Sequence, residues 1–149
     1  MITDKLKLKG RVAFELRDKD GNLKESRKID NLVVDTGLDF IASRIAGASS
    51  NVMSHMALGS GTTAAAAGDT DVESILGSRE ALDSTTVTDN EIVFIASFGA
   101  GSGTGAVTEA GLFNAATSGD MLCRTVFSVI NKSADDSLTV NWTVSVSAS

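Results

Sequence analysis

The chain has 149 residues, one cysteine, no proline and no tyrosine, and its formal net charge is -6 at pH 7. A chain of this length is typical of one domain, residues 1–149, and can bury a core without disulfides or metals. The single cysteine excludes an intrachain disulfide, and the negative charge argues against a general nucleic-acid binder. No apolar run reaches the ~20 residues of a membrane helix, so no membrane partner is expected.

The N-terminal region, residues 5–17, alternates between apolar and basic side chains, which predicts a half-buried strand. The Asp-Gly pair at 20–21 predicts a hairpin turn, so a return strand should run from about residue 23 to 34. One face of the first strand is apolar: Leu6, Leu8, Val12, Phe14 and Leu16. The other face carries five cations, Lys5, Lys7, Lys9, Arg11 and Arg17, of which the first four form the candidate contact strip.

The period changes near residues 36–46, where apolar side chains recur at spacings of three and four and predict one short helix. Asp35 or Thr36 is the candidate cap, and Gly47 is the candidate end. We expect this helix to lie over one end or face of the sheets.

The remainder of the chain predicts further short strands, with a hairpin turn at Asp89-Asn90 and a helical turn at 70–76. The expected strands are residues 55–59, 79–88, 91–98, 107–114, 121–130 and 138–146. In the last of them, Trp142 belongs to the inward-pointing apolar set. The pattern indicates an all-β fold of about eight strands: a two-sheet antiparallel sandwich, with a jelly roll as the expected topology.

Residues that could carry catalysis or bind a metal are sparse. His55 is the only histidine and lies near no nucleophile elbow, and together with Cys123 it makes too few ligands for a zinc site. The Asp-rich turn at 18–22 lacks the glutamate of a calcium loop, with Ile29 at the twelfth position. The glycine-rich segment 99–105 lacks the lysine of a phosphate-binding loop. We therefore expect no enzyme activity, no cofactor, and no catalytic, cofactor-binding or metal-binding residue.

The cationic face of the first strand has two main interpretations. It is either a solvated face whose lysines protect a sheet edge, or a docking strip for an acidic partner surface. Nucleic acid is the weakest interpretation, because no aromatic residues interleave with the basic ones to stack on bases.

Two segments, VTEAGLFN at 107–114 and MLCRTVF at 121–127, resemble strand motifs of tailed-phage capsid decoration (cement) proteins. Residues 31–38, 55–62 and 138–144 resemble other parts of the same pattern, so the resemblance covers about residues 30–146. Related strand motifs also occur in phage tail-collar and tail-fibre modules. The motif residues are structural: Glu109, Gly111, Leu112, Phe113, Arg124 and Trp142.

Five of these motif residues also carry physical expectations. Gly111 should allow close approach of a backbone or ring, and Leu112 and Phe113 should serve opposite faces, one the core and the other an inter-sheet or intersubunit contact. If the two motif strands form a hairpin, Glu109 and Arg124 should pair across them, with at most ~1 kcal/mol of stabilisation.

The resemblance implies a virion structural protein that decorates and cements a phage capsid by bridging neighbouring major capsid protein subunits. It would be assembled in the host cytoplasm and lie on the capsid surface. Its partners would be the major capsid protein and further copies of itself, as a homo-dimer or homo-trimer, and not nucleic acid. Two alternatives remain: a tail-collar, tail-fibre or baseplate attachment module, and a carbohydrate-binding jelly roll, which the scarcity of aromatic residues disfavours.

Overall fold

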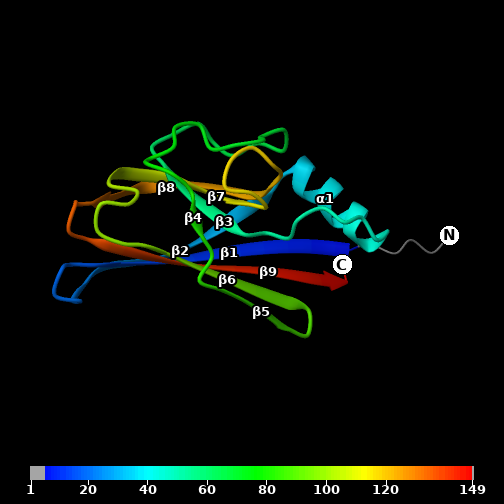
Figure 1. The fold of residues 1–149 in the computed structure, drawn as a ribbon, viewed down its shortest axis with the longest axis horizontal. Helices are drawn as coiled ribbons and strands as arrows, with labels where there is room; N and C mark the ends of the chain where they lie inside the picture. The colour runs from blue at the N-terminus through cyan, green and yellow to red at the C-terminus, as the bar shows by residue number, and fades with distance from the viewer. Residues whose placement is uncertain (1–5, 149) are drawn as a thin grey trace.

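A computed structural model describes residues 6–148, and in them the chain forms nine strands and one helix (Figure 1). The elements are β1 (Leu6–Arg17), β2 (Leu23–Val33), α1 (Asp35–Ile45), β3 (His55–Gly59), β4 (Glu80–Ala81), β5 (Ser84–Thr88), β6 (Glu91–Phe98), β7 (Gly105–Phe113), β8 (Met121–Lys132) and β9 (Ser137–Ala148). The strand pairs are antiparallel, so the expected all-β class with one short helix is confirmed.

The strands form one sheet, in the order β4-β3-β7-β8-β2-β1-β9-β6-β5. Strands β1 and β9 pair along their whole length, whereas β2 and β8 share only the pairs Leu32–Arg124 and Val33–Cys123. The sheet curls at this short junction, which brings β3, β7 and β8 over β1, β9 and β6 (Figure 1).

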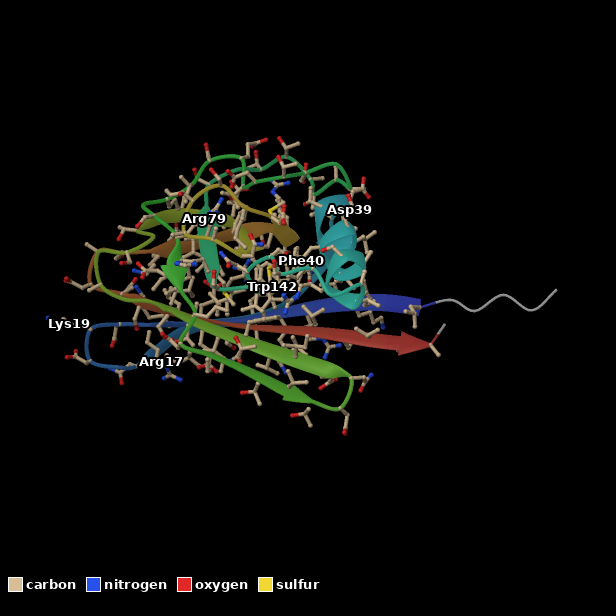
Figure 2. All side chains as sticks on the ribbon, turned by 45° about the vertical axis from the view of Figure 1, so that its right-hand side comes forward. Arg17, Lys19, Asp39, Phe40, Arg79 and Trp142 are labelled. Carbon is tan, nitrogen blue, oxygen red and sulfur yellow. The ribbon has the colours of Figure 1, made fainter. Side chains whose placement is uncertain are left out.

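The core fills the inside of the curl. Trp142 and Phe14 come from one half of the sheet and Leu112 from the other, and all three belong to one buried cluster. Figure 2 shows Trp142 between the two halves. Burying a large apolar side chain contributes roughly 1.5–3 kcal/mol, so this shared cluster holds the halves together.

The alternation expected in the first strand is confirmed over most of its length. Val12, Phe14 and Leu16 are at most 3% exposed, while Lys9 and Arg11, which precede them, are exposed. Leu6 departs from the pattern with 74% exposure, because it lies at the strand end, beyond the cover of the opposite half.

The segment expected as one strand, 79–88, is broken into two. β4 pairs with β3 at one edge of the sheet, and β5 pairs with β6 at the other edge. Only Leu82 and Asp83 separate them, and the backbone N–H groups of these two residues donate to Ser54 and Ile95 respectively. The two edges of the curled sheet are therefore held close together at this point.

Helix α1 lies at one end of the curl (Figure 1) and begins differently from the prediction. Neither Asp35 nor Thr36 caps it: the cap position is Val34, without a side-chain hydrogen bond, and the Thr36 hydroxyl donates to the Met121 carbonyl oxygen at 2.9 Å. Gly47 follows the helix with φ of +87°, and its N–H donates to Arg44, as expected for a helix end. In residues 6–148 no helix is long and apolar enough to cross a membrane.

The expected helical turn at 70–76 does not form. Residues 60–79 instead make an irregular cover over the outer side of β3, β7 and β8, where Val72 packs with Phe113 and Met121 in a second, smaller apolar cluster. The N–H groups of Ser74 and Leu76, which a helical turn would use, instead donate to the Glu109 carboxylate and to the Leu58 carbonyl oxygen. This segment is called the cover loop below.

Candidate functional site

The cationic strip, defined here as Lys7, Lys9 and Arg11, lies on the outer face of β1. All three side chains are exposed, and the strand beneath them pairs with β9 along its whole length and with β2 from Gly10 onward. Lys5, the fourth residue predicted for the strip, lies outside the described residues. β2 pairs with β1 only from Gly10 onward, so residues 6–9, which include Lys7 and Lys9, have a free edge on that side. Protection of a sheet edge and docking of an acidic partner therefore both stay predictions for these lysines.

The surroundings of the strip are polar and partly acidic. Arg11 faces Asp30 of β2 in the register, and Lys9 faces Ser145, which in turn faces Glu91 of β6. A hollow of about 570 Å³ beside the strip is lined by these residues together with Thr143, Leu8, Gly10 and Asn31. Among residues 6–148, the three cations form no ion pair, so their charges are available to a partner.

The motif pair Glu109 and Arg124 meets as predicted, with Nη2 of the arginine 3.1 Å from Oε1 of the glutamate. The pair is buried: Glu109 is 0% exposed and Arg124 is 2% exposed. Buried ions need several hydrogen bonds to offset their lost hydration. The carboxylate obtains them from the N–H groups of residues 61, 73 and 74, at 2.6, 2.7 and 2.8 Å.

Arg124 extends the same network into the cover loop. Its guanidinium pairs with Asp69 at 2.8 Å and donates to the carbonyl oxygen of Thr63 at 3.1 Å. The sequence analysis missed Asp69 and the role of the loop. The available signal was Glu109 itself: a carboxylate between Val107 and an Ala-Gly-Leu-Phe run would be buried, and a buried carboxylate requires donors.

The other motif residues also have structural roles. A Cβ atom on Gly111 would lie 2.8 Å from the Phe113 ring and 3.1 Å from Val72, so the expected close approach is confirmed. Leu112 joins the main core, as predicted for one of the two faces. Phe113 is fully buried under the cover loop, with the Arg79 guanidinium 3.5 Å above its ring, so it makes no intersubunit contact.

A second buried polar cluster, which the sequence analysis did not identify, ties the β8–β9 turn. Lys132 is 2% exposed, and its ammonium donates to carbonyl oxygens of Gly99 and Asp136 at 2.8 and 2.7 Å. Burial lowers the pKa of Lys132. The Asp136 carboxylate accepts from Lys24 at 2.8 Å and from the Ser133 N–H at 2.9 Å, and these bonds lower its pKa.

The two residues considered for catalysis are not brought together into a reactive arrangement. His55 lies beside Ser54, with Nδ1 2.8 Å from the hydroxyl oxygen. Cys123 is buried, and the loss of hydration raises the pKa of its thiol to about 12, which keeps it protonated at neutral pH. Within residues 6–148, no group of three or more His, Cys, Asp or Glu side chains is placed to hold a metal ion.

No family model, curated protein or solved structure matches this chain. Functional inference therefore rests on its residues and their arrangement.

Proposed function

We propose that this chain is a virion structural protein that decorates and cements a phage capsid by bridging neighbouring major capsid protein subunits. The observation that carries the proposal is the cationic strip: Lys7, Lys9 and Arg11 are exposed on a central strand of a protein whose net charge is -6. Solubility does not require positive charge to be concentrated in one place. An acidic capsid surface would be complementary to it.

The resemblance at residues 107–114 and 121–127 supports the same proposal. Its residues act as structural parts: Glu109 and Arg124 fix the cover loop, and Leu112 and Trp142 fill the core. A cement protein must keep its shape under load, and these contacts make the side of the sheet beneath the cover loop rigid. We also infer that the curled sheet is a two-layer β-sandwich of jelly-roll type, since its halves share one core.

We further propose that the protein acts as a homo-dimer or homo-trimer on the capsid surface. Val93 and Ile95 on β6 are half-buried and lie outside the core cluster, and Val129 on β8 is 42% exposed. A closed symmetric contact would cover such side chains. Light scattering of the purified protein tests this, and a strict monomer both free and on capsids would contradict it.

The test of the main proposal is co-sedimentation of purified protein with undecorated phage heads, and separately with tails. Wild-type protein should bind heads, and the triple variant Lys7→Glu, Lys9→Glu, Arg11→Glu should bind at least about tenfold more weakly at low salt, with its circular dichroism unchanged. Binding to tails alone would support the collar, fibre or baseplate alternative.

A charge-matched comparison separates the strip from overall charge. Lys9→Glu and Lys19→Glu make the same change in net charge. Lys9 lies near the start of β1, whereas Lys19 lies beyond its end, in the β1–β2 turn (Figure 2). Only Lys9→Glu should weaken capsid binding. Equal binding by wild type and the folded triple variant would refute the role of the strip.

A further inference from the structure

An apolar groove of about 600 Å³ lies between α1 and the inner face of β5, β6 and β9. The backbone at Leu82 and Asp83 holds the two sheet edges together at one place. At the end of the curl where α1 lies, the helix covers the interior only partly, and the groove opens at that end (Figure 1). Phe40 points from α1 toward the interior, whereas Asp39 points away (Figure 2). The apolar lining includes Phe40, Ile41, Ile45, Val87, Ile92 and Val144. Ile45 is 79% exposed and Val87 is 66% exposed, so residues 6–148 leave the groove uncovered.

Strand β5 forms the border of this groove and ends the sheet. In the described residues it pairs on one side only, with β6. Its sequence is Ser-Thr-Thr-Val-Thr, with all five residues exposed and none charged. Proteins usually protect a free edge with lysine, proline or a bulge. β5 contains neither lysine nor proline, and its register with β6 is unbroken, so its free backbone groups can accept an added strand.

The chain segment that contains β5 is negatively charged. The segment 80–98 contains four acidic residues and no basic one, and exposed Asp83 and Asp89 lie directly at the two ends of β5. Among residues 6–148, Arg44 is the one cation that lines the groove, and its guanidinium is directed at the carbonyl oxygens of Ala48 and Ser50. A basic segment is therefore the complementary occupant.

A second copy of this chain fits the edge poorly. Antiparallel pairing of two β5 strands about Thr86 would place Asp83 of each copy opposite Asp89 of the other, and like charges directly opposite destabilise a strand pair. The basic strip of a second copy offers only a short strand, because β1 pairs with β9 throughout and with β2 from Gly10 onward, which leaves a free edge at residues 6–9 alone among the described residues.

We propose that the free edge of β5 and the adjoining groove bind an extended basic segment of a different polypeptide. The segment adds to the sheet as a strand beside β5. Its alternate apolar side chains enter the groove against Val87 and Ile45, and its basic side chains lie near Asp83 and Asp89. This surface is separate from the cationic strip, so the inference stands or fails independently of the proposed function.

The test uses a fluorescent peptide, acetyl-Lys-Val-Lys-Val-Lys-Val-Lys-amide, titrated with the full chain and followed by anisotropy. We expect saturable binding that weakens as salt is raised. N-methylation of the valines removes the backbone donors and should abolish binding, and a Lys/Gly peptide of equal charge should bind at least about tenfold more weakly. Equal binding of the three peptides would reduce the interaction to charge alone and overturn the proposal.

A matched pair of variants locates the site. Val87→Lys places a cation at the groove and should reduce peptide affinity by at least about tenfold, whereas Val129→Lys, at another exposed valine on β8, should not change it. Unaltered peptide affinity in folded Val87→Lys would overturn the proposal. So would NMR shift changes on peptide binding that avoid the backbone amides of residues 84–88. Self-association through β5 in place of peptide binding would identify a second copy as the occupant and also overturn it. If Val87→Lys does not fold, the comparison of the three peptides with the wild-type chain still decides between the outcomes.

Discussion

Glu109 and Arg124 form an ion pair although they are not opposite one another in the sheet. Arg124 faces Gly111, and Glu109 faces Val126, so the side chains meet diagonally across β7 and β8 at 3.1 Å. This places the carboxylate under the cover loop, where it binds three backbone N–H groups as well as the arginine.

Glu109→Gln should therefore be strongly destabilising. The substitution keeps the shape but removes the charge that compensates buried Arg124, and breaking a buried pair costs about 3–5 kcal/mol. Urea unfolding followed by tryptophan fluorescence measures the loss. Glu15→Gln is the control, because its pair with Arg17 is roughly half exposed and contributes at most ~1 kcal/mol. Similar losses in the two variants would contradict this account.

Gly111→Ala should destabilise the protein by about 1–3 kcal/mol, because the added methyl overlaps the Phe113 ring and forces β7 and the cover loop apart. Gly99→Ala is the matched control, since a Cβ atom there meets nothing within 4 Å. The midpoint of thermal unfolding compares the two. A wild-type unfolding midpoint for Gly111→Ala would show that the Phe113 ring can move without loss of stability.

Cys123 should be unreactive in the folded protein. Its thiol is buried with a pKa raised to about 12, so almost no thiolate exists at neutral pH. The reaction of Cys123 with an aromatic disulfide reagent should be negligible in buffer and fast in concentrated denaturant. At intermediate denaturant concentrations, its rate should follow the rate of unfolding. Rapid labelling under native conditions would contradict the burial of this side chain.

Asp136 should make stability depend on acid. Hydrogen bonds from Lys24 and the Ser133 N–H lower its pKa in the folded state, so the stabilisation is present above the ordinary carboxyl value and is lost as pH falls through the folded value. Asp136→Asn should lower the unfolding midpoint at about pH 7, and the difference from wild type should shrink toward about pH 3. A constant difference between the two midpoints across this pH range would contradict a lowered pKa of Asp136 in the folded state.

The sequence predicted local structure well because its signals are local. Alternation in β1 and β9 identified the faces of Phe14 and Trp142, and Asp20-Gly21 and Asp89-Asn90 identified two hairpin turns. The position of β1 in the middle of the sheet was not predictable, because it depends on pairing with β9, more than a hundred residues later in the chain.

The cover loop shows a second kind of limit. Residues 70–76 have local features of a helical turn, but the Glu109 carboxylate takes the N–H groups of residues 73 and 74. A distant buried charge thus overrides local propensity. The break at Leu82–Asp83 also depends on distant residues, because β4 pairs with β3 and β5 pairs with β6 at the two edges of the sheet.

The pairing of β1 with β9 has a consequence for how the molecule forms. The first and last strands of the described chain are neighbours in the centre of the sheet, so Phe14 cannot complete its packing until residues 137–148 are available. Long-range pairing of this kind slows folding, because a large loop must close before its contacts are gained. During synthesis on the ribosome, the hairpin of β1 and β2 must therefore wait, with its apolar face exposed, until residues 137–148 have been made.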